Sequence, residues 1–482
     1  MDAITTFRRA VHRGPHRIFA FDGATSITYA DADTRSDAIA TALSEAGLSP
    51  GETLGLSSPD SVDQLLAIVG AWKAGVLPGF IDARTADDTL PYFVQDVGAK
   101  LVLAAPQVHE RLRSAGAPEV ADLATFGNDA RPTAIDEHGV DVPFYLSYTS
   151  GTTGPPKGAI LLSGPVTVGT ACIADRLGIT RDDVLLATTP TASSFQLVAA
   201  FLPALHVGAS IGLVAGRSVE EIWSVARERR ASVLVAYPLT LADVVHAPEA
   251  SEAASPIRLA LSGGSPLAPR IKRAYRETLG IPLLESYGQS ELGGFMALGA
   301  PGDGERSLAG FVGRPLPDRL AYVGDAGGVE VAPGEVGEVL IPWGFFDAYR
   351  NKPEETRKAQ AGGVLHCGDL AEADVDGYLK VLGRTREAAA AARRGGFLRE
   401  LEDALYEHGA VLHAAVVERA SDGAVSAFVE LRRGQDTSAD ELASFAASKI
   451  PAGLAPVSTT VLERMPRTFS GKADRLSLST EA

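Results

Sequence analysis

The sequence of 482 residues contains little cysteine and has fewer basic than acidic side chains. Its two cysteines, Cys172 and Cys367, cannot form a disulfide framework, which favours a reducing compartment. No stretch of about 18 apolar residues occurs, so no membrane span is expected. The net charge of −16 argues against a general nucleic-acid binder, because neutralising phosphates requires a basic surface.

These absences lead us to expect a soluble, cytoplasmic protein. The first 21 residues show no long apolar core after their charges, so no signal peptide is predicted. Hydrophobic residues make up 45% of the chain and charged residues 22%, which is typical of a globular protein. The length exceeds what one compact core accommodates and indicates two or three domains.

Strand-like and helix-like segments alternate through most of the chain. Between residues 183 and 279, apolar strands alternate with helices, one of which is predicted over 195–207, ending near Gly208. Such alternation implies an α/β fold with parallel sheets covered by helices. From about Ser307, glycine and proline punctuation predicts a small, barrel-like antiparallel part. We therefore predict a large N-terminal domain, 1–383, and a small mobile α+β C-terminal domain, 384–482.

The loop at residues 148–158 (YTSGTTGPPKG) has the composition of a polyphosphate-binding loop. Glycines allow the backbone N–H groups to turn toward an anion, hydroxyls add donors, and Lys157 adds a full charge. A Walker A motif would require glycine at position 156 and serine or threonine at position 158, where Pro156 and Gly158 stand. A Rossmann GxGxxG at a strand end is also absent, so neither of these nucleotide-binding motifs applies.

In this loop and in several other motifs, the chain resembles the adenylate-forming superfamily: acyl- and aryl-CoA synthetases, adenylation domains of peptide synthetases, and luciferases. The resemblance extends over nearly the whole chain, with the motifs in the family's order. They are Ile27-Thr28-Tyr29, Trp72-Lys73-Ala74-Gly75 with Pro78 and Asp82, residues 149–158, Gly263-Gly264-Ser265-Pro266-Leu267, Tyr287-Gly288-Gln289-Ser290-Glu291, Gly337-Glu338, Gly368-Asp369-Leu370, Asp376-Gly377-Tyr378 with Gly383-Arg384, and Pro466-Arg467-Thr468 with Gly471-Lys472 and Asp474-Arg475.

The resemblance implies ATP and Mg²⁺ as cofactors and assigns roles to individual residues. Lys472 would bridge the acid and the α-phosphate, with Glu291 and Thr152 as further catalytic residues that hold Mg²⁺. Tyr287 would stack on adenine, and Asp369 and Arg384 would contact the ribose. The remaining predicted nucleotide contacts are Thr149, Ser150, Gly151, Thr153, Gly154, Lys157, Gly264, Ser265, Pro266, Gly288 and Ser290.

The acid-binding pocket is predicted from the positions of the same motifs. Its members would be Ser193, Phe195, Tyr237, Ser262, Gly263 and Gly293. Residues 190–196 contain neither histidine nor an acidic side chain, so the ammonium of an α-amino acid would lack a partner. A small-molecule aryl or acyl carboxylic acid is therefore expected, and the small glycines favour a planar ring.

One departure from the family pattern concerns the acceptor of the acyl group. The usual hinge residue is replaced by Arg386, and the lysine that normally follows falls on an alanine. In the family, this segment faces the active site during thioester formation. Transfer to the thiol of CoA or of a carrier-protein phosphopantetheine is expected. Transfer to an amine or another nitrogen, and a non-catalytic nucleotide-binding protein of the same fold, are the alternatives.

Overall fold

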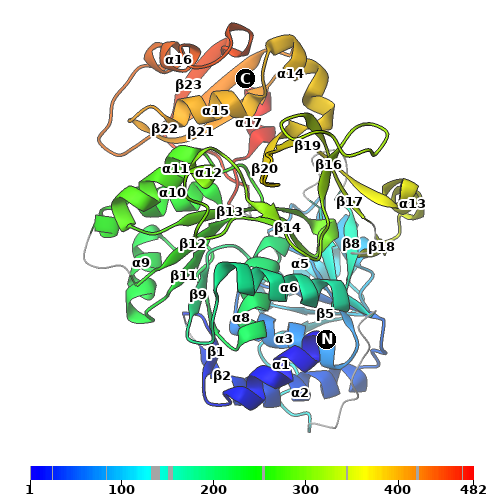
Figure 1. Cartoon of the computed structure of the whole chain (residues 1–482). Coiled ribbons are helices and arrows are strands. Elements are labelled where there is room, and N and C mark those ends of the chain that lie inside the picture. The colour runs from blue at the N-terminus through cyan, green and yellow to red at the C-terminus, as the bar shows by residue number, and fades with distance from the viewer. Residues whose placement is uncertain are drawn as a thin grey trace.

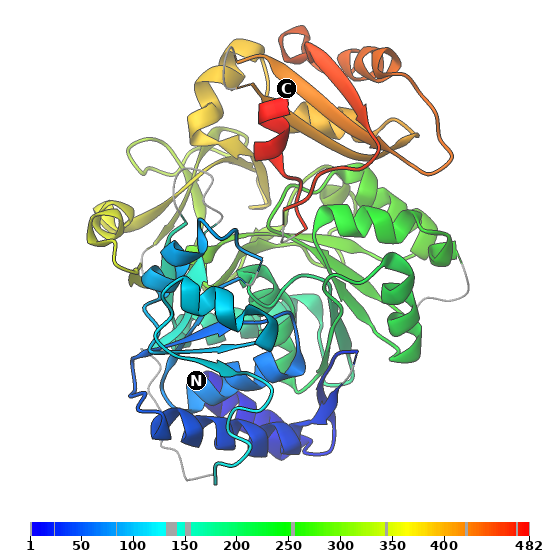
Figure 2. The ribbon, with the colours of Figure 1, turned by 180° about the vertical axis from the view of Figure 1, so that it is seen from behind.

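The structure is a computed structural model of the chain. It describes residues 2–23, 25–82, 84–131, 142–149, 156–251, 256–342, 346–419, 423–468 and 471–481. Two sheets of mainly parallel strands form the large N-terminal domain, and a C-terminal domain lies above them (Figure 1). The same arrangement is visible from behind (Figure 2).

Nine of the described strands form the first sheet. The six from β13 to β1 in its order run parallel, and β2, β14 and β15 add antiparallel strands at its edges. Their order is β15 (Arg314–Pro315), β14 (Gly294–Leu298), β13 (Leu283–Gln289), β12 (Leu259–Ser262), β11 (Val233–Val235), β9 (Val184–Ala187), β10 (Ser210–Leu213), β1 (Ile18–Phe21) and β2 (Ser26–Thr28).

The second sheet contains seven of the described strands and carries the predicted phosphate loop. Strands β7, β4, β3, β5 and β6 run parallel, whereas β8 and β18 are antiparallel additions beyond β7. Their order is β18 (Phe346–Tyr349), β8 (Gly158–Leu162), β7 (Pro143–Tyr148), β4 (Leu77–Phe80), β3 (Thr53–Ser57), β5 (Leu101–Ala104) and β6 (Val120–Asp122).

Helices cover both sheets and separate them. Helix α6 contacts β14 of the first sheet and β7 and β8 of the second, so it packs between them. The helices of the large domain are α1 (Ala3–Arg13), α2 (Tyr29–Glu45), α3 (Val62–Lys73), α4 (Leu90–Val97), α5 (His109–Ser114), α6 (Ser163–Leu177), α7 (Ser194–Gln196), α8 (Leu202–Val207), α9 (Val219–Glu228), α10 (Pro238–His246), α11 (Pro269–Ala274), α12 (Gly304–Leu308) and α13 (Pro353–Ala359).

Local sequence signals explain several helix boundaries. Helix α9 begins at a capping box in which Ser218 and Glu221 satisfy each other's backbone amides. The segment predicted as one helix over 195–207 comprises α7, a π-helical turn at Leu197–Phe201 and α8, and it ends at the left-handed Gly208. Pro203 is the second residue after the π turn, and a proline lacks the amide hydrogen of a regular helix.

The predicted antiparallel part is a four-stranded sheet of β16 (Tyr322–Gly324), β17 (Val336–Pro342), β19 (Val364–Ala373) and β20 (Leu379–Arg384). After β20, the chain forms α14 (Ala388–Arg394) and then the C-terminal domain, as α15 (Leu398–Tyr406), β21 (Val411–Glu418), β22 (Val425–Leu431), α16 (Ala439–Ala447), β23 (Ser458–Leu462) and α17 (Arg475–Glu481). Strand β23 pairs in parallel with β22.

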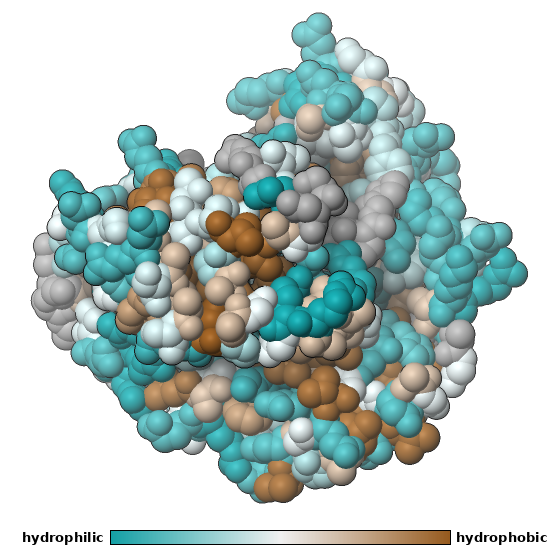
Figure 3. Space-filling view, turned by 90° about the horizontal axis from the view of Figure 1, so that it is seen from above, coloured by the Kyte–Doolittle hydropathy of each residue, from teal (hydrophilic) through white to brown (hydrophobic). Residues whose placement is uncertain are grey.

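The predicted α/β fold with a large parallel-sheet domain and a smaller C-terminal domain is confirmed. Apolar side chains of both sheets meet in one buried cluster, which includes Leu54 and Leu56 of β3, Leu185 of β9 and Val235 of β11. None of the helices in the described ranges combines the length and apolar character needed to cross a bilayer. Seen from above, hydrophobic residues on the surface form small groups between hydrophilic ones (Figure 3).

Candidate functional site

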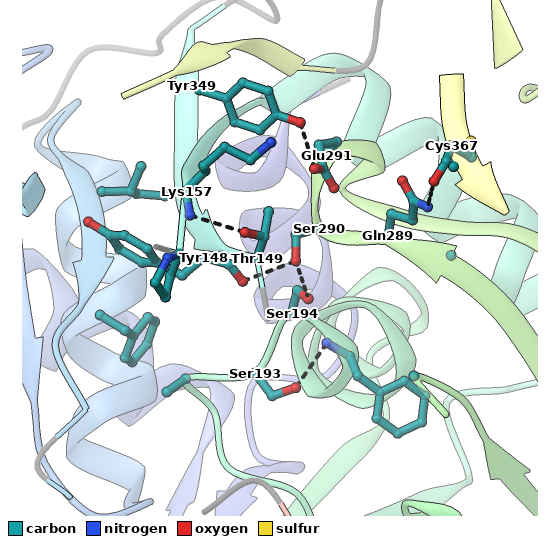
Figure 4. A pocket seen from close by; sticks show the side chains of 18 of the residues that line it. Tyr148, Thr149, Lys157, Ser193, Ser194, Gln289, Ser290, Glu291, Tyr349 and Cys367 are labelled. Carbon is teal, nitrogen blue, oxygen red and sulfur yellow. Dashed lines mark hydrogen bonds between the residues drawn. The ribbon is translucent and has the colours of Figure 1, made fainter. Parts of the chain in front are cut away.

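A cavity of about 970 Å³ lies where the carboxyl ends of parallel strands from both sheets face the C-terminal domain (Figure 4). This edge of an α/β sheet is the usual place for a ligand, because loops from several strands converge there. Eleven of the predicted site residues line the cavity: Thr149, Lys157, Ser193, Phe195, Tyr237, Gly264, Gly288, Ser290, Glu291, Arg384 and Lys472.

Both ends of the phosphate loop are fixed at the cavity. The backbone amide of Thr149, after β7, donates to the Lys157 carbonyl at 2.9 Å, and the Lys157 amide donates to Thr149 Oγ1 at 3.0 Å. The Lys157 ammonium lies 4.3 Å from the centroid of the Tyr349 ring. The predicted loop residues Ser150, Gly151, Thr152, Thr153 and Gly154 lie outside the described residues.

The 3-10 turn directly after β13 (Ser290–Leu292) places Ser290 and Glu291 close to the described ends of the phosphate loop, as Figure 4 shows. The hydroxyl of Ser290 donates to the Tyr148 carbonyl at 3.1 Å, which joins the two sheets at this point. The hydroxyl of Tyr349 donates to Glu291 Oε1 at 2.6 Å. Burial and the adjacent Glu291 carboxylate raise the pKa of Tyr349, so the phenol stays protonated and remains a donor.

Asp369 lies beside the cavity in a set of charged and polar contacts. Its Oδ2 accepts hydrogen bonds from the Tyr287 hydroxyl at 2.6 Å and from Gln289 Nε2 at 2.8 Å, and Arg384 Nε lies 3.1 Å from Oδ1. Burial raises the pKa of Asp369, against the opposing effect of Arg384. Gln289 and Arg384 line the cavity, whereas Asp369 and Tyr287 stand behind them.

Lys472 enters the cavity from the C-terminal domain. Its Nζ lies 5.0 Å from the centroid of the Tyr237 ring. Gly264 approaches the same place: it has a φ of +70°, and a Cβ there would lie 2.9 Å from the Tyr237 ring and 3.2 Å from Lys472 Nζ. Burial, together with the charge of Arg384, lowers the pKa of Lys472 to about 8.

Aromatic side chains and hydroxyls form one wall of the cavity. Phe195 stacks on Tyr237 with ring centroids 5.2 Å apart, and Phe295 lies 6.0 Å from Phe195. The hydroxyls of Ser193 and Tyr237 are 2.6 Å apart, and either can donate. Tyr237 is fixed at the beginning of α10, so both its ring and its hydroxyl have defined positions.

Five further predicted residues do not line the cavity. A Cβ on Gly263 would lie 2.3 Å from Ser286 Oγ and 2.6 Å from Phe195, so those side chains cover it. A Cβ on Gly293 would meet Val166 and Leu161, and the next glycine, Gly294, lines the cavity instead. The remaining three are the fully buried Ser262 and the pair Ser265 and Pro266 after Gly264.

Several cavity residues were not predicted from the sequence. Tyr349 comes from β18, which reaches the site by pairing with β8, and no local motif surrounds it. Gln289 lies inside the motif around Tyr287, so its position in that motif was an available signal. The lining also includes Asp82, Arg84, Ser286, Lys358, His366, Cys367, Thr385 and Arg386.

Comparisons with known proteins identify the family of this chain. Residues 7–342 match the model of the AMP-binding enzyme family, and residues 400–472 match that of the AMP-binding enzyme C-terminal domain. The chain is 26% identical to a feruloyl-CoA synthase of an Amycolatopsis species, with 96% of each chain covered. It is also 26% identical to a 4-hydroxybenzoate–CoA/benzoate–CoA ligase of Rhodopseudomonas palustris, with 96% of this chain and 90% of that protein covered.

Among solved structures, a benzoate CoA ligase from Burkholderia xenovorans superimposes with a TM-score of 0.90, at 24% identity, covering 99% of this chain and 100% of that one. The fold is therefore shared over essentially the whole chain. Together with the two family models, these findings confirm the resemblance expected from the sequence motifs. The chain belongs to the family of AMP-binding enzymes and is an adenylate-forming ligase similar to acyl-CoA synthetases.

Proposed function

We propose that this enzyme activates an aromatic carboxylic acid with Mg-ATP and then transfers the aroyl group to the thiol of CoA. One observation carries the proposal. The Lys472 ammonium, the aromatic wall around Phe195 and the ends of the phosphate loop line one cavity. The acid and the triphosphate can therefore bind side by side in this cavity with the Lys472 ammonium between them, which is the arrangement that adenylation requires.

In the first step, a carboxylate oxygen attacks the α-phosphorus, the bond from that phosphorus to the bridging oxygen breaks, and pyrophosphate leaves. Negative charge increases on the α-phosphate oxygens during this displacement. Lys472 would stabilise that charge, because a fixed cation in a water-poor site interacts strongly with a developing anion. The amides and hydroxyls of the phosphate loop would bind the β- and γ-phosphates.

Glu291 fits the role of a Mg²⁺ ligand. Its carboxylate lines the cavity beside the phosphate loop and is oriented by the Tyr349 hydroxyl. Within the described ranges, no group of three or more His, Cys, Asp or Glu side chains is arranged to hold a metal ion. Phosphate oxygens and water would therefore supply most of the ligands, as is usual for Mg²⁺ in nucleotide sites. Bound Mg²⁺ would neutralise charge on the departing pyrophosphate.

An aromatic acid is supported by the wall formed by Phe195, Tyr237 and Phe295. Aromatic rings pack well against one another at centroid separations of 4.5–7 Å, and Phe195 and Tyr237 already stack at 5.2 Å. The two relatives at 26% identity that are named for feruloyl-CoA and benzoate–CoA also support an aromatic substrate. The hydroxyl pair of Ser193 and Tyr237 adds a polar contact for a ring substituent.

In the second step, the thiolate of CoA would attack the acyl carbon, and AMP would leave. We infer that the chain divides at Gly383 and Arg384 into parts 1–383 and 384–482, and that the C-terminal part rotates between the two steps. Strand β20 ends at Arg384, and the adjoining Thr385 and Arg386 line the cavity. Rotation about this point would exchange Lys472 for another surface of the C-terminal part.

ATP–pyrophosphate exchange over a panel of benzoates, cinnamates, fatty acids and amino acids tests the first step. We expect exchange with aromatic acids and its loss in Lys472→Ala. Product analysis with CoA, with a phosphopantetheinylated carrier protein and with amines then identifies the acceptor. Absence of exchange with every acid, in a folded sample that binds ATP, would refute adenylation. Amide formation without thioester would refute the CoA step.

A further inference from the structure

Asp243 of the large domain contacts the C-terminal domain next to the element that carries Lys472. It lies on α10, which begins directly after the cavity residue Tyr237. Its Oδ1 lies 2.7 Å from Nε2 of the fully buried His413, on β21, and its Oδ2 accepts a hydrogen bond from Arg467 Nη2, also at 2.7 Å. Both carboxylate oxygens of one residue are thus used to hold the other domain.

Arg467 lies in a short segment, 466–468, that pairs with segment 471–474, which carries Lys472; the two paired segments are called the Lys472 hairpin. Arg467 and Ala473 form an antiparallel bridge, and the Thr468 amide donates to the Lys472 carbonyl at 2.8 Å. The hairpin closes through the Asp474 amide, which donates to the Pro466 carbonyl at 2.9 Å. Because these bonds connect the two arms, the backbone position of Lys472 follows that of Arg467.

The side chain of Lys472 has little else to hold it. Among the described residues, its ammonium has no hydrogen-bond acceptor, and it lies near the Tyr237 ring and the position that a Cβ on Gly264 would occupy. Contact with a ring centroid at 5.0 Å is less directional than a hydrogen bond. The location of the ammonium is therefore determined mainly by the hairpin and by what the hairpin is attached to.

We propose that Asp243 is a positioning residue for adenylation: it attaches the Lys472 hairpin to the large domain through Arg467 and His413, and it releases both when the C-terminal domain rotates. The inference rests on the proposed role of Lys472 and adds the residue that sets its position. Asp243 itself is not among the residues that line the cavity, so it acts through Arg467. Its contacts serve the first half-reaction and are not needed once the acyl-adenylate has formed.

Another charged contact between the domains provides a control. Arg273, just before the end of α11, pairs with Glu407, directly after α15. This ion pair also joins the large domain to the C-terminal domain, but neither residue contacts Arg467 or the hairpin in the described structure. Glu407→Gln therefore removes an interdomain charge pair without removing the attachment of Lys472.

The test measures the two half-reactions separately in Asp243→Asn, Glu407→Gln and the parent enzyme. Asparagine keeps the size of the side chain but removes the charge that pairs with Arg467 and His413. Misplacing a catalytic group by about 1 Å can cost about 100-fold in rate, so we expect the kcat of pyrophosphate exchange to fall by about that factor in Asp243→Asn. The KM values for ATP and acid should change little. Thioester formation from purified acyl-adenylate and CoA should stay near the parent rate.

Glu407→Gln should leave both half-reactions near the parent rates. Equal losses in both half-reactions of Asp243→Asn would indicate a general structural defect and overturn the inference, as would unchanged exchange. Arg467→Lys supplies a second variant, which keeps the charge while shortening the reach to Asp243, and should reproduce the selective loss. If Lys472→Ala retains full exchange, the proposed function fails as well. If it abolishes exchange while Asp243→Asn and Arg467→Lys do not, only the present inference fails.

Discussion

The lowered pKa of Lys472 predicts a specific alkaline limit for the adenylation step. With a pKa of about 8, roughly 90% of the free enzyme carries the charged ammonium at pH 7 and about 10% at pH 9. Because only the charged form can stabilise the α-phosphate, kcat/KM for ATP should be level below pH 7. It should fall about tenfold per pH unit above pH 8. An unperturbed lysine, with a pKa near 10.5, would keep the profile level to about pH 10.

The pH profile of kcat should lie at higher pH than that of kcat/KM. The profile of kcat/KM for ATP reports the free enzyme, whereas kcat reports the enzyme with its substrates bound. Bound triphosphate favours the charged form of a nearby amine, which raises the pKa of Lys472 in the complex. Pyrophosphate exchange, measured from pH 6 to pH 10 at several ATP concentrations, separates the two profiles.

Two variants identify the group responsible. In Lys472→Arg the guanidinium stays charged throughout this range, so the alkaline decline should disappear even though the rate is lower. In Arg384→Gln the decline should move to higher pH, because the charge of Arg384 contributes to lowering the pKa of Lys472. A profile that stays level to pH 10 in the parent enzyme would refute the reasoning. So would a decline that persists unchanged in Lys472→Arg.

Three further predictions concern packing and charge. Gly264→Ala should lower the free energy of urea unfolding by about 1–3 kcal/mol and slow pyrophosphate exchange, because the new Cβ would crowd the Tyr237 ring and Lys472. Gly47 has a similar φ but open space around it, so Gly47→Ala is the control and should leave pyrophosphate exchange unchanged. Tyr349→Phe removes the hydrogen bond to Glu291 and should raise the Mg²⁺ concentration for half-maximal exchange about tenfold, whereas an unchanged requirement would separate Tyr349 from metal binding. The Lys73 ammonium lies 2.6 Å from each of two carboxylates on α2, and Lys73→Met removes this shared partner. We expect the free energy of urea unfolding to fall by about 3–5 kcal/mol. A loss below 1 kcal/mol would refute this estimate.

Local signals in the sequence were sufficient for much of the fold. The capping box at Ser218 and the glycine at position 208 mark helix boundaries through interactions within a few residues. The motifs from Thr149 to Lys472 predicted eleven residues that line one cavity in the structure. The roles proposed for these residues remain predictions, as do the metal site at Glu291 and the division of the chain at Arg384.

Other parts of the site depended on contacts between distant segments. The register of β13 and β14 shifts between Tyr287 and Gly288, and Gly294 of β14 lines the cavity while Gly293 faces the core. Such a choice between adjacent residues follows from strand pairing, which no local motif specifies.

The sequence by itself determined the parallel-sheet architecture, the adenylate-forming family and the lysine proposed to complete adenylation, because each depends on residue types at short, fixed spacings. Only the tertiary structure decided which side chains contact the hairpin that carries that lysine and which side chain contacts Glu291. Asp243 and Arg467 are separated by 224 residues, and Tyr349 and Glu291 by 58. Those pairs form because the packing of two domains and the pairing of β18 with β8 bring them within hydrogen-bond distance.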